Sequence, residues 1–493
     1  MNPRSTFFPL ILALFFAVPS VSQATPNQVE AFFTPDQGES AFREIYATLA
    51  SAQKEALITV YSWSDKDLDQ AILQALSNGA TVRLVLHPEL TAKKNLMDRC
   101  ADLESHGAQI KIAPRNMHEK FVLVDGAVAI NSSANFSIGA RKFYSENIVF
   151  IRALSALLSR TIRDEFAFLW DASRDLITHQ EPLAPFMGGA QRSPKSAHSE
   201  EAIQFYSSSM NLIAKETQAE SEARKSGKAL TLRLRTSENP KDAGGPPWVV
   251  RDLIIESIDA AQVRIEGNLN HFNIREIADA LLRADARGVD VRLNVDQQEY
   301  QTEWNPDFIE MTPYFVSEWR KSHPGLSPPV RIKTYSLEPT PAHWLLNHHK
   351  IFLIDYVAGR PLLPSTRLLT GSYNFSRTAE HAQFDNMIEF RGETHKGVYQ
   401  AFADEFRHLW QWGRTSSDQL DENALNRWLT IASDGTLGLH FHEAQALSWT
   451  EMEALRERVK KLAPGLLENL TRKTAECSRY HVVKKQFLGC PNP

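Results

Sequence analysis

Hydrophobic and polar positions along the chain alternate between two periods. Residues 42–49 carry apolar side chains at the three- and four-residue spacing of an amphipathic helix, and residues 57–61 then form a short apolar run. A second helical pattern covers residues 68–76, and residues 82–86 and 121–124 are typical of buried strands. This alternation predicts an α/β fold, in which helices cover both faces of a mixed, mainly parallel sheet.

The chain contains the same unit twice. The chemistry-bearing residues of the two copies, in the same order, are His118, Lys120, Asp125, Ser133, Asn135 and Glu146, and His348, Lys350, Asp355, Ser372, Asn374 and Asp385. The spacings from histidine to lysine, from lysine to aspartate and from asparagine to the last acid are identical. The one length difference lies near Gly359, where a lengthened turn is expected. Asp-Glu-Phe-x-x-Leu-Trp, at 164–170 and 404–410, predicts a helix packed on each sheet. Such an ordered series indicates a duplication that gave two similar lobes.

The duplication sets the expected domain organisation. The first lobe covers residues 25–175 and the second, with insertions, residues 201–414. Residues 176–200 are polar and irregular, as a linker is. Residues 415–493 match nothing in the first lobe and are expected to form a C-terminal extension with a helical tail.

The first 24 residues are expected to be an export signal. Arg4 is the only charge before an apolar run at 7–18, and the small residues Ser22 and Ala24 follow, which is the order of a secretory signal peptide cleaved after Ala24. The apolar run is shorter than the roughly 20 residues that a membrane-spanning helix needs. The sequence therefore predicts removal of the signal and a periplasmic or secreted protein.

Composition narrows the classes of function. Hydrophobic residues make up 43% of the chain, as in a globular protein, and 54 Lys and Arg stand against 59 Asp and Glu. A protein that holds nucleic acid through its overall charge is usually basic, so a polyanion would need a local positive site here. Because both lobes lie in one chain, a dimer is not required, and we expect a monomer.

The C-terminal extension offers two local predictions. Thr450 and Glu453 have the spacing of a capping box at the start of a helix. Export permits disulfides, and Cys477 and Cys490 are near enough in sequence to close a small loop, which leaves Cys100 as a free, buried thiol. Sequence alone does not settle this pairing. Three cysteines are too few for a disulfide scaffold.

The doubled His-x-Lys-x4-Asp pattern, with Gly371-Ser372-x-Asn374 after the second copy, resembles the phospholipase D superfamily. The resemblance extends from the signal to the extension, and it implies two phospholipase D-like lobes and a phosphoric diester hydrolase without a metal or other cofactor. Two positions depart from the family pattern. Ser132 stands where glycine is usual, and Asp385 replaces glutamate, so that its carboxylate is expected to lie further from its histidine.

The chemistry of a phosphodiester explains these residue types. Its oxygens are negatively charged, so a catalyst must neutralise them and present a nucleophile. A neutral imidazole attacks phosphorus and gives a covalent phosphohistidine, while a second, protonated imidazole protonates the departing alkoxide. One lobe supplies only one imidazole, so the two lobes must meet. The resemblance implies that His118 is the nucleophile and His348 the general acid, and the reverse assignment stays open.

The other repeated residues have expected supporting roles. Glu146 and Asp385 bind the far nitrogens of the imidazoles and fix their tautomers. The groups expected to hold the phosphate are Lys120, Lys350, Asn135 and Asn374, assisted by Ser133 and Ser372. Asp125 and Asp355 are expected to support loops. The bystander histidines, which have no counterpart in the first lobe, are His343, His349 and His381. His440 and His442 lack further ligands at metal-site spacing, so no metal is expected.

The substrate class stays open at this stage. The first hypothesis is an exported phospholipase D-like hydrolase of phospholipid head groups, with peripheral membrane contact, which the aromatic insertions Trp304, Tyr314, Phe315 and Trp344 favour. The second is an exported nuclease of the same superfamily with the same mechanism, for which nucleic acid is the substrate. The third is a catalytically silent module that binds phosphate groups, which two intact His and Lys pairs argue against.

Overall fold

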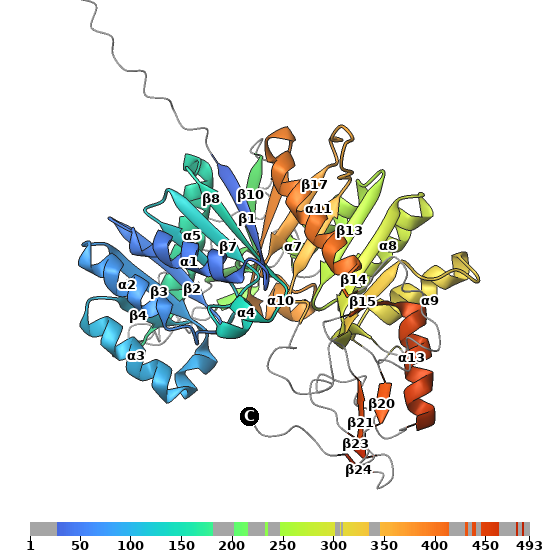
Figure 1. Ribbon diagram of the computed structural model, residues 1–493. Coiled ribbons are helices and arrows are strands. Elements are labelled where there is room, and N and C mark those ends of the chain that lie inside the picture. Colours follow the sequence, from blue (N-terminus) through green and yellow to red (C-terminus); the bar gives the residue numbers. More distant parts are fainter. Residues whose placement is uncertain are drawn as a thin grey trace, which may run out of the picture.

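The protein consists of two similar lobes placed side by side (Figure 1). The computed structural model describes residues 27–180, 202–214, 232–234, 247–300, 306, 309–334, 346–413, 429–431, 436–439, 445–462, 480–481 and 486–487. The expected export signal, most of the linker, and Cys477 and Cys490 lie outside these described residues.

The first lobe is built on an eight-stranded sheet with the order β1-β8-β7-β6-β2-β3-β4-β9. Its strands are β1 (Gln28–Thr34), β2 (Glu55–Val60), β3 (Thr81–Leu86), β4 (Gln109–Ile112), β6 (Phe121–Val124), β7 (Val128–Ser132), β8 (Glu146–Arg152) and β9 (Arg174–Asp175). Its helices are α1 (Gly38–Ala50), α2 (Asp67–Ser77), α3 (Lys94–Ser105), α4 (Ile138–Lys142) and α5 (Ala156–Ala172). The predicted helices and strands of this lobe are therefore confirmed.

The second lobe repeats this sheet with the order β10-β19-β17-β16-β13-β14-β15-β22. Its strands are β10 (Ile203–Ser207), β13 (Arg264–Leu269), β14 (Asp290–Asp296), β15 (Val330–Thr334), β16 (Lys350–Ile354), β17 (Arg367–Gly371), β19 (Asn386–Arg391) and β22 (Gln445–Ser448). Its helices are α7 (Val249–Asp259), α8 (Arg275–Ala286), α9 (Thr312–Ser322), α10 (Arg377–His381), α11 (Lys396–Trp410) and α13 (Trp449–Leu462).

Small sheets complete the described structure. β5 (Asn116–Met117) pairs with β18 (Gln383–Phe384), and β11 (Leu212–Ala214) pairs with β12 (Leu232–Leu234). A four-stranded sheet is formed by β20 (Leu429–Ile431), β21 (Thr436–Leu439), β23 (Tyr480–His481) and β24 (Gln486–Phe487). The β5·β18 pair joins the two lobes.

The mixed α/β fold with two similar lobes is confirmed, but the expectation of mainly parallel sheets is wrong. In each lobe only two neighbouring pairs are parallel, β2·β3 and β3·β4 in the first and β13·β14 and β14·β15 in the second. All other neighbours in the two sheets are antiparallel. Helices α2 and α3, and likewise α8 and α9, cross over between the parallel strands, whereas β6 and β7, and likewise β16 and β17, are joined without a helix and pair antiparallel.

The two lobes share one hydrophobic layer. α1, α2 and α3 pack on the outer face of the first sheet, and α7, α8, α9 and α13 on the outer face of the second. Between the sheets, α5 and α11 pack with apolar side chains from both lobes in a single cluster. The rings of Phe121 and Phe205, one from each lobe, lie 6.0 Å apart in this cluster. Burial of this shared layer holds the lobes in a fixed relation, which a site between them requires.

The C-terminal extension is more than a helical tail. β22 pairs antiparallel with β15 and forms the edge of the second sheet, as β9 does with β4 in the first. α13 buries Trp449, Leu455 and Val459 in the outer core of the second lobe. Part of the extension therefore completes the second lobe, which the sequence did not reveal because the intervening segment is much longer there.

The capping box of α13 lies two residues before the predicted one. Ser448 Oγ accepts the backbone N–H of Glu451 at 3.2 Å, and Glu451 Oε2 accepts the backbone N–H of Ser448 at 2.7 Å. Glu453 instead forms an ion pair with Arg320 at 2.9 Å. The pair Ser448 and Glu451 has the same spacing as the pair Thr450 and Glu453. Because β22 ends at Ser448, the helix starts there and the first pair forms the capping box.

The described residues include Cys100 and the helices that could be tested for crossing a membrane. Cys100 is a free, buried thiol as predicted, and burial raises its pKa to about 12. Among the helices of the described ranges, none combines the length and the hydropathy that crossing a bilayer requires.

Candidate active site

Two histidines from opposite lobes face each other. His118 lies between β5 and β6, and His348 lies two residues before the start of β16. Their rings are 6.5 Å apart between centroids and nearly perpendicular, at 75°. Lys120 and Lys350 lie two residues further along each chain segment and are both buried. The lobes therefore bring the two His-x-Lys motifs into one site, as the duplication predicted.

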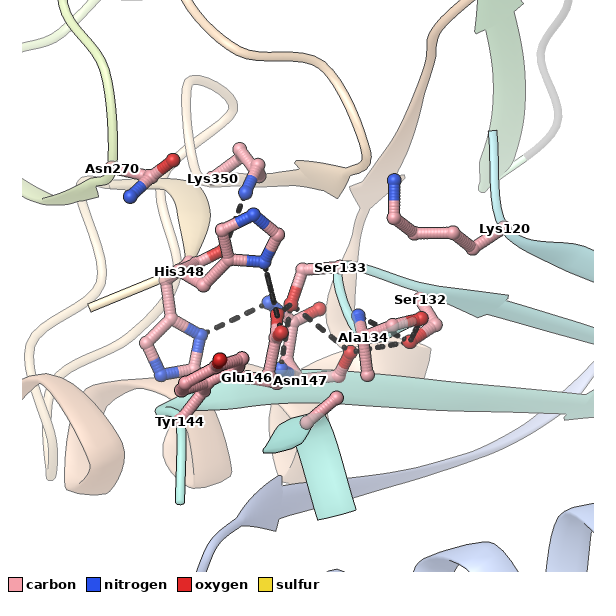
Figure 2. A network of polar contacts seen from close by, with 12 residues as sticks. Lys120, Ser132, Ser133, Ala134, Tyr144, Glu146, Asn147, Asn270, His348 and Lys350 are labelled. Atoms are coloured by element: carbon pink, nitrogen blue, oxygen red, sulfur yellow. Dashed lines mark hydrogen bonds and ion pairs between the residues drawn. The ribbon is translucent and has the colours of Figure 1, made fainter. Parts of the chain in front are cut away.

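Each histidine binds the acid of the other lobe. His118 Nδ1 lies 2.8 Å from Asp385 Oδ1, and His348 Nδ1 lies 2.8 Å from Glu146 Oε2. Figure 2 shows His348 of the second lobe above Glu146 of the first. The expectation that the shorter Asp385 lies further from its histidine is wrong, since the two distances are equal. With Nδ1 facing a carboxylate, the Nε2 atoms are the ones left for chemistry.

Backbone pairing across the lobes explains this crossed arrangement. β5, just before His118, pairs in parallel with β18, just before Asp385, and the His118 N–H donates to Phe384 O at 2.8 Å. On the other side Ser145 bridges Asn347, and the His348 N–H donates to Ser145 O at 2.9 Å. Each histidine is thus held beside the partner lobe's acid by main-chain hydrogen bonds. The pairing of β5 with β18 lies next to Asp385. The shorter side chain of Asp385 therefore still reaches His118 at a normal hydrogen-bond distance.

The two motif serines bind the acids. Ser133 Oγ donates to Glu146 Oε2 at 2.7 Å, and Ser372 Oγ donates to Asp385 Oδ1 at 2.7 Å. Because a hydroxyl has one proton to donate, both hydroxyls are committed to the acids here, and their assistance to phosphate binding stays a prediction. Gln383 Nε2 donates to the second oxygen of Asp385 at 2.5 Å. These donors orient the carboxylates that orient the imidazoles.

The site concentrates buried positive charge. Lys120 Nζ donates to the carbonyl of His118, and Lys350 Nζ donates to the carbonyl of His348 at 2.6 Å. Burial lowers the pKa of Lys120 to about 8 and that of Lys350 to about 7. An anion bound between them restores the charged ammonium form, since it supplies the compensation that water no longer gives. The site therefore favours a negatively charged ligand.

Burial also shifts the acid–base groups. The pKa of His118 falls to about 4, mainly because burial disfavours the imidazolium, and burial also holds the pKa of His348 well below its usual value. The pKa of Glu146 rises to about 8 because its carboxylate is buried. Without an anion in the site, both imidazoles are neutral near pH 7. A bound phosphate would raise their pKa values through its negative charge.

The motif asparagines lie in the loops that follow β7 and β17. The side-chain Oδ1 atoms of Asn135 and Asn374 are buried, and neither takes a hydrogen bond from the described residues. The same feature in both lobes shows that these two carboxamide oxygens are not committed to neighbouring groups of the described residues. They stand beside the serines that hold the acids and are available to a ligand.

Asp125 and Asp355 lie at the other end of their strands and fasten loops. Both have positive φ angles, 52° and 54°. The Asp125 carboxylate accepts backbone N–H groups of residues 53, 54 and 55, and Asp355 accepts those of residues 262, 263 and 264. Each aspartate thus holds the start of its lobe's central strand, β2 or β13.

Replacing Asp125 with alanine is expected to lower the free energy of unfolding by about 1–3 kcal/mol. Three backbone N–H groups lose their acceptor, and alanine tolerates the positive φ angle poorly. Asp125→Asn should cost less, because asparagine adopts this conformation and keeps an acceptor oxygen. The thermal midpoint of the purified variants measures the effect. An unchanged midpoint for Asp125→Ala would show that the loop does not depend on this carboxylate.

A third buried lysine at the site escaped the sequence analysis. Lys333 of β15 donates to Ser145 Oγ, and burial lowers its pKa to about 7. Glu146 and Asp296 are among the charges that act on it. By strand register the corresponding residue of the first lobe is Ala113. The sequence offered one signal for this residue, a lysine between apolar residues of a strand. A search for repeated residues missed it because the first lobe has no lysine at the corresponding position.

The expected bystander histidines and the aromatic residues of the expected insertions do not place their rings between the facing imidazoles where the structure describes them. His349 is buried between Asn147, at 3.1 Å, and Glu405, at 2.9 Å. The ring of His381 packs on Trp248. Tyr314 and Phe315 are buried in the outer core of the second lobe, so they do not overhang the site. The positions that fall outside the described residues are Trp304, His343, Trp344, His440 and His442.

The described ranges contain no group of three or more His, Cys, Asp or Glu side chains placed to hold a metal ion. The groups that the described residues bring together here are imidazoles, ammonium groups and carboxylates. Duplicated sheets whose His-x-Lys motifs converge, each with an acid from the opposite lobe, define a class of two-lobed phosphodiester-processing proteins.

The chain belongs to the phospholipase D-like family whose model is described as cardiolipin synthase, PLD-like domain. The model matches residues 45–170 and 254–410, more than half of the chain. One match lies in each lobe and contains that lobe's histidine, lysine and acid.

Curated proteins and a solved structure are similar to parts of this chain. A mitochondrial cardiolipin hydrolase of Xenopus tropicalis is 28% identical over 149 residues, which are 29% of this chain and 69% of that protein. A phospholipase D of Rickettsia prowazekii is 28% identical over 137 residues, 27% of this chain and 63% of that protein. Phosphatidylserine synthase of Haemophilus influenzae is 13% identical, with a TM-score of 0.48, and the match covers 78% of this chain and 88% of that one. The family and the relatives support a phosphodiesterase-type hydrolase.

Proposed function

We propose that this protein is an exported phosphodiesterase that removes the head group from phospholipids through a covalent phosphohistidine. The observation that carries the proposal is the pair of imidazoles from opposite lobes, 6.5 Å apart, each bound to the other lobe's carboxylate. The names of the relatives, cardiolipin hydrolase and phospholipase D, favour a phospholipid over other diesters. Export rests on the N-terminal pattern at 1–24, and a monomer suffices because one chain supplies the whole site.

The first step forms a bond between histidine and phosphorus. Asp385 accepts the Nδ1 proton of His118, which leaves a lone pair on Nε2. This nitrogen attacks phosphorus, and the bond between phosphorus and the head-group oxygen breaks. His348 Nε2 gives its proton to that oxygen, so the head group leaves with a neutral hydroxyl rather than as an alkoxide. His118 is the nucleophile on the strength of the family resemblance.

The second step releases the lipid. Water attacks the phosphohistidine, and His348 takes the proton that this water loses. The bond between phosphorus and His118 breaks, which yields phosphatidic acid and the free enzyme. Lys120 and Lys350 neutralise the phosphoryl oxygens in both steps, and Glu146 stabilises the imidazolium form of His348. Substrate binding supplies the negative charge that lets His348 hold a proton.

A comparison of substrates in EDTA tests the proposed function. The purified protein, without residues 1–24, is given choline phospholipid vesicles and, separately, single-stranded DNA. We expect release of choline and phosphatidic acid at an undiminished rate in EDTA. Cleavage of DNA alone would replace the proposal with a nuclease. Tight binding to vesicles without any product would indicate a silent binding module. A variant that lacks both His118 and His348 serves as the control for contaminating hydrolases.

A further inference from the structure

The two walls of the active site differ at corresponding positions. Shortly after β2, Trp63 bridges the loop that follows Asn135, and shortly after β13, Phe272 bridges the loop that follows Asn374. These bridges align the two lobes residue by residue. Residues 61–62, Tyr and Ser, therefore correspond to residues 270–271, Asn and His. If both halves of the site bound the same chemical group, the two lobes would not need different residues at these positions.

The wall of the first lobe is aromatic. The ring of Tyr61 stands edge-on to His118, with 4.7 Å between centroids, and Lys120 Nζ lies 4.8 Å from the Tyr61 centroid. Tyr61 is partly exposed. The ring of His87 lies 4.7 Å from that of Tyr61, and its Nδ1 accepts the backbone N–H of Met117 at 3.1 Å. Tyr61 therefore offers an apolar surface next to His118.

The wall of the second lobe is polar. Asn270 is buried, and its Nδ2 donates to the carbonyl of Asn347 at 3.0 Å. Figure 2 shows Asn270 beside Lys350 and above His348. The next residue, His271, is partly exposed, and its Nδ1 lies 3.6 Å from Oε1 of the buried Glu299. Burial is the main cause of the lowered pKa of His348, and His271 is among the side chains that lower it as well. This wall therefore presents hydrogen-bonding groups next to His348.

We propose that this asymmetry fixes the orientation of the substrate. The head group that leaves lies against Asn270 and His271, which accept hydrogen bonds from its N–H or O–H groups. The alcohol that stays on phosphorus, with its apolar substituents, lies against Tyr61. The inference rests on the proposed function, because His348 protonates the leaving oxygen and so places the head group at the second-lobe wall.

The physical basis is the cost of removing each part from water. An amine or hydroxyl that enters the site without a partner loses its hydrogen bonds to water, so it needs the acceptors of the second lobe. Contact with an aromatic ring stabilises apolar carbon, because it removes apolar surface from water. Contact with an amide or imidazole that must stay hydrogen-bonded does not. The predicted substrate is therefore a phospholipid whose head group carries hydrogen-bond donors, such as ethanolamine.

Four soluble diesters test this orientation separately from the reaction itself. They are the dihexanoyl phosphatidyl compounds of ethanolamine and choline, below their micellar concentrations, and the corresponding glycerophospho compounds without acyl chains. Ethanolamine and choline carry the same charge, but only ethanolamine has N–H donors. The acylated and deacylated compounds differ only on the retained side. kcat/KM is measured for all four.

A substitution in the second-lobe wall should change the ratio of kcat/KM between ethanolamine and choline diesters. A substitution in the first-lobe wall should change the ratio between acylated and deacylated diesters. His271→Ala is expected to lower kcat/KM for both ethanolamine diesters by roughly tenfold or more and to leave both choline diesters nearly unchanged. Tyr61→Ala should lower kcat/KM for both acylated diesters by roughly tenfold, whatever their head group, and Tyr61→Phe should restore it. Ser62→Ala, at the position that matches His271, is the control and should change neither ratio.

Other outcomes contradict the orientation. Loss by the same factor on all four substrates would mean that Tyr61 and His271 only support the site. A change of head-group preference in Tyr61→Ala would reverse the assignment of the walls. If the wild-type protein cleaves bis(p-nitrophenyl) phosphate but none of the four diesters, it is a phosphodiesterase of another substrate class. If it cleaves none of the five compounds, the proposed function itself is wrong.

Discussion

Replacing either His118 or His348 with alanine is expected to reduce phosphodiester turnover by about 10⁴-fold or more while the fold stays intact. The two imidazoles act as one unit, because attack on phosphorus and protonation of the leaving oxygen occur in one step. Losing the nucleophile leaves no covalent route, and losing the acid makes an alkoxide the leaving group. Initial rates on a phospholipid, with thermal midpoints as a check on folding, measure the effect.

Histidines outside the site provide matched controls. His106 of the first lobe and His408 of the second are exposed, with side-chain accessibilities of 55% and 48%. His106→Ala and His408→Ala should keep wild-type rates. Retained turnover in His348→Ala would show that one histidine suffices and that the other lobe only binds phosphate.

The attacking histidine is identified by trapping the intermediate. A substrate labelled at phosphorus, mixed with enzyme and quenched in alkali, should leave label on His118, since phosphohistidine survives alkaline conditions. The label should be absent in His118→Ala and should persist longer in His348→Ala if any forms. Label on His348 of the wild-type protein would exchange the two roles and leave the rest of the mechanism unchanged.

Removing the charge of one acid is expected to disable the histidine of the opposite lobe. Asp385→Asn should lower kcat by about 10²–10⁴-fold with little change in KM, because an amide no longer fixes the tautomer of His118 or stabilises its charged form. Glu146→Gln should act in the same way through His348. Both replacements keep the size of the side chain, so the hydrogen-bond partners Ser372 and Ser133 stay in place.

The crossed pairing has a spectroscopic signature that a merely structural effect would not produce. In nitrogen NMR spectra of the imidazoles, Asp385→Asn should shift the Nδ1 resonance of His118 and leave that of His348 nearly unmoved. Glu146→Gln should do the opposite. The resonances are assigned with the two histidine-to-alanine variants. If Glu146→Gln moved the signal of His118 instead, each histidine would be paired within its own lobe, contrary to the structure.

The sequence by itself determined the local parts of this protein. The equal spacings around His118 and His348 showed the duplication, and the helical and strand patterns located elements such as α1, β2 and β6. These features depend on residues near each other in the chain, where periodicity and motif spacing reflect geometry directly. For the same reason the repeat revealed the set of residues in the site before any arrangement was known.

Only the tertiary structure decided how the parts meet. The hydrogen bond between His118 and Asp385 joins residues 267 positions apart, and the one between His348 and Glu146 spans 202. No local pattern encodes which strand pairs with which across the lobes, and that pairing crosses the acids and turns the serines toward them. Lys333 and the contrast between Tyr61 and Asn270 break the symmetry of the repeat, so they were invisible to a search for repeated residues. Strand pairing and burial are long-range, and they set both the mainly antiparallel sheets and the charge of the site.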